Sequence, residues 1–226
     1  ATRLKTIGAA MIVLVVLLVA VGYSMVTRMS SATTEMYNRG LVGSKLLSDA
    51  NNAVWELRFG IANYTLASPE NRKKILDGRP PLYGLLDESL NKYASLGVST
   101  EQDPTLKELL AAFQQYKAGA PKWFELIDAD KLPEAAEYRA KVTNAAGSAM
   151  VKNIRALIET QIKINDELEK KARAAAESAQ NLLVSIGGAA FLLVVASIAL
   201  MVRAISRPLT QIQAEIEEVD KSSDFT

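Results

Sequence analysis

The sequence contains no cysteine and no histidine among its 226 residues. Without cysteine the chain forms no disulfide and offers no thiolate as a nucleophile or metal ligand. Without histidine it lacks the commonest general base and the commonest zinc ligand. An enzyme would have to rely on carboxylates or lysines, and the sequence shows no constellation of these. We therefore expect no catalytic site, no metal and no cofactor.

An excess of charge of one sign is also missing. The chain has 26 Lys and Arg residues against 25 Asp and Glu residues, for a formal net charge of +1. Such an even balance of positive and negative charge gives no argument for a nucleic-acid partner. Proline is scarce, with 7 residues, and glycine is modest, with 12. Alanine, leucine, glutamate and lysine are abundant instead, and this composition predicts an all-α protein of long helices.

Two long runs carry no charged residue at all, residues 7–26 and residues 182–202. Each run has about 20 residues, enough to cross a bilayer as a helix surrounded by membrane lipid. A signal peptide is the alternative for the first run. Its apolar stretch is longer than the usual core of about 7–15 residues, and no small-residue cleavage site follows cleanly. We therefore expect two transmembrane helices.

The charges that flank these runs predict the orientation of the chain. Basic residues precede the first run and follow the second: Arg3 and Lys5 before the first, Arg203 and Arg207 after the second. The positive-inside rule then places residues 1–6 and 203–226 in the cytoplasm and residues 27–181 on the other side. Arg28 is the one contrary charge, and its long side chain can reach the outer interface.

Residues 27–181 amount to one domain, which we expect to contain four helices joined by short connections. The helices are predicted at about 27–67, 68–95 with an interruption at 77–81, 103–129 and 134–203. Such an order predicts an antiparallel up-down-up-down bundle. The first and last helices continue into the transmembrane runs, and a rigid helix carries a small shift from one end to the other.

Helical periodicity predicts which faces are buried. The first helix carries an apolar stripe of Leu47, Ala50, Val54, Leu57, Ile61 and Tyr64. The fourth helix carries a stripe of Thr143, Gly147, Met150, Ile154, Leu157, Gln161, Ile164 and Leu168. Beside the apolar stripe of the first helix runs a second one, of mixed chemistry: Asn51, Trp55, Arg58, Ala62 and Thr65. We expect this second stripe to face a partner helix or a ligand.

Arg58 is the leading candidate for ligand binding. Its planar guanidinium can hold a carboxylate through two parallel hydrogen bonds. The alternative is a solvated arginine, or an ion pair with Asp49 or Glu56 on a neighbouring turn.

Helix arithmetic adds candidates at the level of Arg58, about 45 Å from the membrane at about 1.5 Å per residue. The residues expected at this level are Arg79, Tyr83, Trp123, Thr143 and Asn144. Prolines interrupt the inner helices at the same level, and such breaks free backbone carbonyls and open space for a ligand. The alternatives are ordinary core aromatics, an exposed loop charge at Arg79, and a Thr143 hydroxyl bonded to its own helix.

The chain resembles the bacterial methyl-accepting chemotaxis proteins whose periplasmic sensor is a four-helix bundle. The order of span, bundle and span carries the resemblance over almost the whole chain. Residues 37–58 resemble the first helix of that sensor. The segment Ile205-Ser206-Arg207-Pro208-Leu209 resembles the start of a HAMP signal-relay module, and Asp224-Phe225-Thr226 resembles the end of that module's first helix.

The resemblance implies a homodimer in the bacterial inner membrane that captures a ligand in the periplasm, near the membrane-distal end. In the aspartate-sensing members, first-helix arginines hold the ligand's carboxylates and the fourth helix adds a threonine hydroxyl and backbone carbonyls. Arg58 fits the arginine role, but Asn51 and Ala62 stand where other members carry a second arginine. A small monocarboxylate or an aromatic acid is therefore expected, and an amino acid is a further option.

Two alternatives remain at this stage. The same sensor module could serve a sensor kinase or a nucleotide-cyclase receptor, which differ in their cytoplasmic part. The bundle could also bind a periplasmic partner protein instead of a small molecule. A polar pocket at the level of Arg58 favours direct sensing, whereas a fully packed bundle with an exposed apolar tip favours a protein partner.

Overall fold

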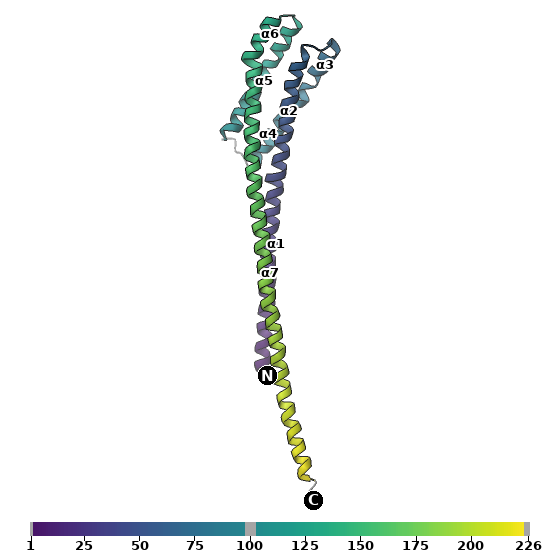
Figure 1. Ribbon diagram of the computed structural model, residues 1–226, viewed down its shortest axis with the longest axis vertical. Helices are drawn as coiled ribbons and strands as arrows, with labels where there is room; N and C mark the ends of the chain where they lie inside the picture. The colour runs from purple at the N-terminus through teal and green to yellow at the C-terminus, as the bar shows by residue number, and fades with distance from the viewer. Residues whose placement is uncertain (1, 98–102, 224–226) are drawn as a thin grey trace. The chain divides into compact units, whose positions relative to one another are not determined.

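The computed structural model describes residues 2–97 and 103–223, and every regular element in these ranges is a helix (Figure 1). The elements are α1 (Thr2–Glu35), η1 (Met36–Leu41), α2 (Val42–Tyr64), α3 (Pro69–Asp77), α4 (Arg79–Ser95), α5 (Pro104–Asp128), α6 (Leu132–Tyr138), η2 (Arg139–Thr143) and α7 (Asn144–Ser223). The two η segments are π-helices. The predicted all-α fold is confirmed.

The chain divides into two compact units. One unit spans Ser31–Ala172 and contains the bundle, in which helical segments run alternately up and down (Figure 1). The other unit contains α1 up to Ser30 and α7 from Arg173. The predicted HAMP residues Arg207, Pro208 and Leu209 lie within the backbone bounds of α7. Their side chains, and the whole of residues 224–226, lie outside what the structure describes.

Capping residues define where the inner helices begin. The Ser68 side chain accepts a hydrogen bond from the Asn71 amide at 3.4 Å, and Pro69 takes the first position of α3. The Asp103 side chain accepts one from the Thr105 amide at 2.8 Å, ahead of α5. Each cap satisfies an amide that has no partner inside its helix. Both helix starts were predicted from the sequence.

The predicted interruptions of the inner helices are smaller than expected. Only Gly78 separates α3 from α4. Pro80 and Pro81 lie in the first turn of α4, where an amide would lack an intrahelical acceptor in any case. Pro121 lies inside α5, which continues to Asp128. The prolines therefore create no long break in the bundle.

The first and fourth helices change their winding instead. In each, a short π-helix interrupts the α-helical pattern: η1 between α1 and α2, and η2 between α6 and α7. A π-turn holds one extra residue, so it alters the face on which later residues lie and leaves carbonyls poorly satisfied. Such segments are frequent at functional sites. Neither segment was predicted from the sequence.

The bundle core matches the predicted stripes. The six apolar residues predicted on the first helix are all buried, and in the fourth-helix stripe only Ile164 is partly exposed. Large aromatic side chains from the inner helices fill the space between them: Tyr93, Phe113, Tyr116 and Trp123. The second stripe of the first helix remains at least partly exposed. Two adjacent stripes thus serve two different surfaces.

One core residue yields a stability prediction. The Tyr93 hydroxyl is buried and has no hydrogen-bond partner among the described residues. Burial, with a smaller contribution from the Asp103 charge, raises the pKa of Tyr93 to about 12. We expect Tyr93→Phe to raise the free energy of unfolding by about 1 kcal/mol at neutral pH, because it removes an unsatisfied polar atom. Thermal unfolding followed by circular dichroism measures this change.

The same tyrosine predicts alkaline sensitivity. Its folded-state pKa lies above the ordinary value of 10.0, so ionisation of Tyr93 disfavours the folded state: the bundle keeps its full stability below pH 10 and loses stability as the pH rises towards 12. Tyr93→Phe should lose less stability over that range than the unmodified chain. Tyr64→Phe is the matched control at neutral pH, because the Tyr64 hydroxyl donates to Asp128 at 2.8 Å. That variant should be destabilised, and stabilisation of both variants would contradict the argument.

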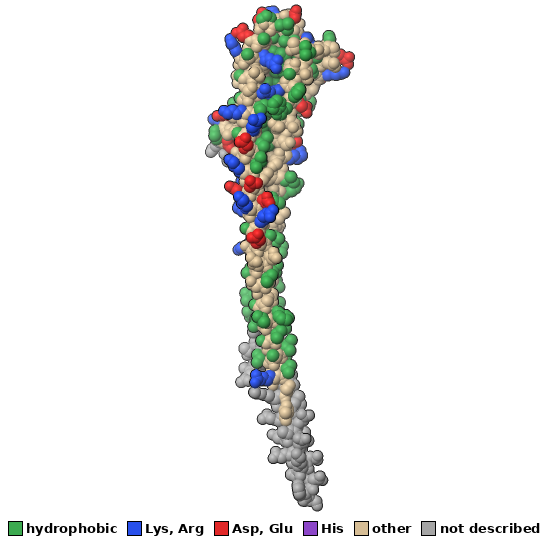
Figure 2. Space-filling view, in the orientation of Figure 1, with side chains coloured by type: hydrophobic (Ala, Val, Ile, Leu, Met, Phe, Trp, Pro, Cys, Tyr) green, Lys and Arg blue, Asp and Glu red, His purple; other side chains and the backbone are tan. Residues whose placement is uncertain are grey.

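Within residues 2–97 and 103–223, two helices are long and apolar enough to cross a membrane. The most apolar window of each is almost entirely unburied within the protein, so these windows are not part of the bundle core. Figure 2 shows hydrophobic side chains along these stretches and charged side chains over the bundle. This distribution agrees with two membrane-spanning segments and a water-facing bundle.

Candidate functional site

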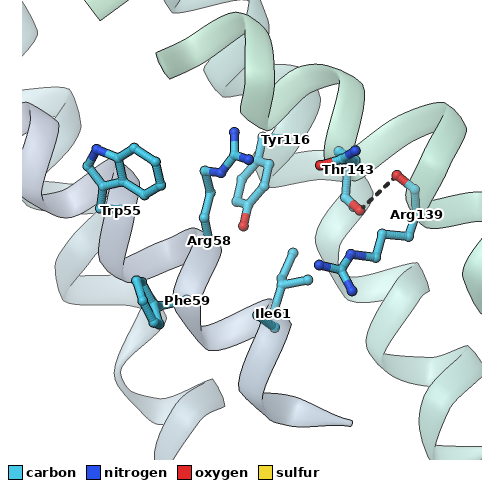
Figure 3. Close-up of a pocket in the computed structure, with 9 residues that line it drawn as sticks. Trp55, Arg58, Phe59, Ile61, Tyr116, Arg139 and Thr143 are labelled. Atoms are coloured by element: carbon cyan, nitrogen blue, oxygen red, sulfur yellow. Dashed lines mark hydrogen bonds between the residues drawn. The ribbon is translucent and has the colours of Figure 1, made fainter.

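A cavity of about 180 Å³ lies in the bundle between α2 and the segment formed by η2 and the start of α7 (Figure 3). Side chains from α2, α5, η2 and α7 line it: Trp55, Arg58, Phe59, Ile61, Ala62, Tyr116, Arg139, Thr143 and Asn144. Four of the eight residues predicted from the sequence are among them, namely Trp55, Arg58, Thr143 and Asn144. The second stripe of the first helix therefore supplies one wall.

Arg58 reaches the cavity because the Trp55 ring lies against its guanidinium and the facing residue, Gly147, has no side chain. Its guanidinium carbon lies 5.5 Å from the centre of the Trp55 ring, one turn earlier on α2. On the facing helix, a Cβ built on Gly147 would lie 3.4 Å from Arg58 Nη1. A side chain at position 147 would therefore be in van der Waals contact with this guanidinium. Arg58 thus passes between an indole and a glycine backbone.

Arg139 is a second cation at this cavity, and it was not predicted from the sequence. It is the first residue of η2, and its backbone oxygen accepts a hydrogen bond from the Thr143 hydroxyl at 3.5 Å. Its guanidinium carbon lies 5.9 Å from the centre of the Trp123 ring. One signal could have revealed it: Arg139 precedes the candidate Thr143 by four residues and therefore shares its helix face.

The cavity is electropositive. No acidic residue lines it, and neither Arg58 nor Arg139 forms an ion pair within the described part of the chain. The carboxylate of Asp49, one alternative partner of Arg58, is held by Lys45. Two guanidinium groups without a carboxylate favour the binding of an anion.

The remaining walls are largely apolar. Tyr116 donates its hydroxyl hydrogen to the Leu57 carbonyl at 2.9 Å. Burial raises the pKa of Tyr116, while the nearby positive charges of Arg79 and Arg58 act in the opposite direction. The phenol is therefore neutral at physiological pH and presents its ring to the cavity. Together with Phe59 and Ile61, it forms a surface suited to the carbon atoms of a small ligand.

Arg79 and Tyr83, two other predicted residues, do not line this cavity. Arg79 is only 5% exposed and donates to the Leu57 carbonyl at 3.2 Å and to the Tyr83 hydroxyl at 2.7 and 3.0 Å. Its guanidinium also lies over the rings of Tyr116 and Phe124. Arg79 is therefore a buried arginine that joins three helices, and not an exposed loop charge.

The last predicted residues have other positions. Trp123 is buried and lines a neighbouring hollow of about 430 Å³, which shares Arg139 and Asn144 with the cavity. Asn51 is partly buried on α2, seven residues before Arg58. Thr143 lines the cavity while its hydroxyl bonds to its own helix, as the alternative interpretation proposed.

The fold defines a class of protein: an all-α four-helix bundle joined in sequence to helices long enough to cross a membrane. The chain belongs to the family described as a four-helix-bundle sensory module for signal transduction, which matches residues 1–176. This is the sensory module of methyl-accepting chemotaxis proteins, so the resemblance seen in the sequence is confirmed. A comparison with curated proteins found no match.

Proposed function

We propose that this protein is the sensory and transmembrane part of a chemoreceptor that binds a small carboxylate-bearing ligand in the cavity beside Arg58. The observation that carries this proposal is the half-buried Arg58 guanidinium, which lines a cavity without an acidic partner. A volume of about 180 Å³ suits a small organic acid. The family's role as a sensory module supports the same function.

The proposed signal is a small helix shift. The cavity is bounded by α2 on one side and by η2 with α7 on the other, so a ligand contacts both the first and the fourth helix of the bundle. The ligand can shift the equilibrium between two arrangements of these helices only by the difference between its affinities for the two arrangements. Shifts of about 1–2 Å are sufficient in known switches of this kind.

The membrane arrangement is part of the proposal. The bundle lies in the periplasm, both termini lie in the cytoplasm, and residues 203–226 begin a HAMP module that receives the shift. The receptor works as a homodimer in the inner membrane. Its cytoplasmic output is chemotaxis signalling, and a kinase or cyclase output is the alternative that the same sensor would serve. The balance of basic residues around the two apolar runs supports this orientation.

A second candidate function rests on the turn between α2 and α3. Leu66 in this turn is 92% exposed, and Leu132 at the start of α6 is 50% exposed. Apolar residues exposed together favour the docking of a partner protein, and Leu132 lines the same hollow as Thr65, the neighbour of Leu66. A periplasmic solute-binding protein would then deliver the signal, and the cavity beside Arg58 would not need to bind a free acid.

Ligand-induced stabilisation tests the proposal. The full chain in lipid nanodiscs is heated with a panel of small organic acids, aromatic acids and amino acids, and unfolding is followed by intrinsic fluorescence. A ligand at 100 times its dissociation constant should stabilise the bundle by about 2.7 kcal/mol. The amide of each acid is the control, because it keeps the shape and removes the charge. Equal effects of acid and amide, or no effect across the panel, would count against carboxylate sensing.

A further inference from the structure

We infer that Arg139 is a second anion-binding residue and that the cavity takes a small dianion, such as a short-chain dicarboxylate. This inference rests on the proposed function, because it names the ligand class of the same cavity. It replaces the monocarboxylate or aromatic acid expected from the sequence. That expectation followed from the search for a second arginine on the first helix, whereas the structure supplies one from η2.

The balance of charge is the first argument. Two guanidinium groups line one cavity of about 180 Å³, and none of the other lining residues is acidic. The acidic residue one turn before Lys141, Glu137, is already paired with that lysine. A monoanion would neutralise one guanidinium and leave the other beside it uncompensated. A dianion neutralises both, and charge-assisted hydrogen bonds to each end are the stronger kind.

The two tryptophans of the chain are the second argument. The sequence contains only two, and each lies against one of these arginines: Trp55 against Arg58 and Trp123 against Arg139. The face of an indole attracts a guanidinium and restrains it where no carboxylate is present. Trp123 is itself fixed in the core by Phe124, with ring centres 5.2 Å apart. Both cations are therefore held in place before a ligand arrives, which lowers the entropic cost of binding.

The shape of the cavity is the third argument. Arg58 comes from α2, and Arg139 comes from the facing helix, with Ile61 between them in the view of Figure 3. A short dicarboxylate has the same arrangement, with two charged ends and an apolar middle. The ring of Tyr116 and the side chain of Ile61 can contact that middle, while each carboxylate meets one guanidinium. An aromatic acid would fill the apolar middle but offer nothing to the second arginine.

Paired probes test this inference. Isothermal titration of the full chain in nanodiscs compares unbranched dicarboxylates of three to five carbons with monocarboxylates of the same chain length. The unmodified chain should bind its preferred dicarboxylate about 10- to 100-fold more tightly than the matched monocarboxylate, because a hydrogen bond to a charged group contributes about 1.5–3 kcal/mol. A monocarboxylate that binds as tightly as the dicarboxylate would overturn the inference.

Variants at Arg139 separate a ligand contact from a structural role. Arg139→Gln should weaken dicarboxylate binding about 10- to 100-fold and leave monocarboxylate binding within about threefold, so that the preference disappears. Lys141→Gln is the matched control, because it removes a positive charge from the same segment at an exposed side chain paired with Glu137. It should leave both affinities unchanged. Equal losses for both ligands in Arg139→Gln would indicate a structural role and overturn the inference.

The failure of the inference can be distinguished from the failure of the proposed function. If Arg58→Gln abolishes acid binding while Arg139→Gln keeps the preference for the dicarboxylate, only the role of Arg139 is wrong. If Arg58→Gln leaves acid binding unchanged, the cavity is not the binding site and both conclusions fail. The absence of binding by any acid also contradicts both.

Discussion

Replacement of Arg58 by alanine is expected to weaken the binding of a carboxylate ligand at least about 30-fold while the bundle stays folded. Truncating one partner of a buried charge pair costs about 2–5 kcal/mol, mostly because the remaining charge is left without a partner. In Arg58→Ala the ligand's carboxylate would remain in a cavity with apolar walls and one fewer donor. Isothermal titration of the full chain in nanodiscs measures the loss.

The fold should tolerate this substitution. Arg58 is partly exposed, its guanidinium lies over the Trp55 ring, and it forms no ion pair within the described residues. Circular dichroism should therefore show an unchanged helical content. Arg58→Lys should restore part of the affinity, because lysine keeps the charge but lacks the planar fork that holds a carboxylate at two points.

A matched control separates this effect from a general loss of positive charge. Arg155 is exposed on α7, so Arg155→Ala removes the same charge and a similar side chain from the surface. Its ligand affinity should equal that of the unmodified chain. If Arg58→Ala binds the ligand normally, the binding site lies elsewhere, and the neighbouring hollow lined by Trp123 becomes the first alternative.

Replacement of Gln161 by methionine is expected to lower the free energy of unfolding of the bundle by about 2–3 kcal/mol. Gln161 is 2% exposed, and its Nε2 donates to the Arg39 carbonyl at 2.8 Å, the Gly40 carbonyl at 3.2 Å and the Asn165 side-chain oxygen at 2.9 Å. The two carbonyls belong to η1. Methionine has a similar length but no donor, and each unsatisfied buried acceptor costs about 1–3 kcal/mol.

This glutamine explains how the bundle tolerates a π-helix in its first helix. A π-turn disturbs the regular amide-to-carbonyl pattern, and the Gln161 amide supplies a donor from α7. Close approach is possible because residue 43 is glycine, where a Cβ would lie 2.9 Å from the Gln161 side-chain oxygen. Asn165 continues the contact by donating to the Ser44 hydroxyl at 2.9 Å. The first and fourth helices are thus joined by hydrogen bonds at this level.

Thermal unfolding of the full chain in nanodiscs tests the role of Gln161. Glu159→Gln, on the exposed face of the same helix, is the control and should leave the unfolding midpoint unchanged. Gln161→Glu should be the more destabilising variant at pH 7, because a carboxylate cannot donate to the carbonyls of η1. Its destabilisation should diminish at acidic pH, where the protonated carboxyl regains a donor. A midpoint that is the same in all three variants would contradict the argument.

Much of the fold could be predicted because the signals for it are local. The period of apolar residues on the first helix placed Leu57 and Ile61 in the core, and both are buried. Ser68 and Asp103 act through amides two or three residues away, so their caps could be identified from neighbouring residues alone. The two apolar runs follow from composition and length.

The site could be predicted only in part. Arg58, Trp55, Thr143 and Asn144 were found because they lie on helix faces at a similar level, which regular helix geometry predicts. Arg139 was missed because the second arginine was sought on the first helix, whereas the structure supplies it from η2. Arg79 was expected as a ligand contact or a loop charge, but its partners come from α2 and α5, which are distant in sequence.

The sequence by itself therefore determined the helices, their buried faces, the apolar runs and the family, because these depend on residues a few positions apart. Only the tertiary structure decided that the two arginines facing one cavity come from different helices, Arg58 from α2 and Arg139 from η2. The physical reason is that a cavity exists only where side chains of several helices fail to fill the space between them, and residues so far apart in sequence meet only after the helices have packed.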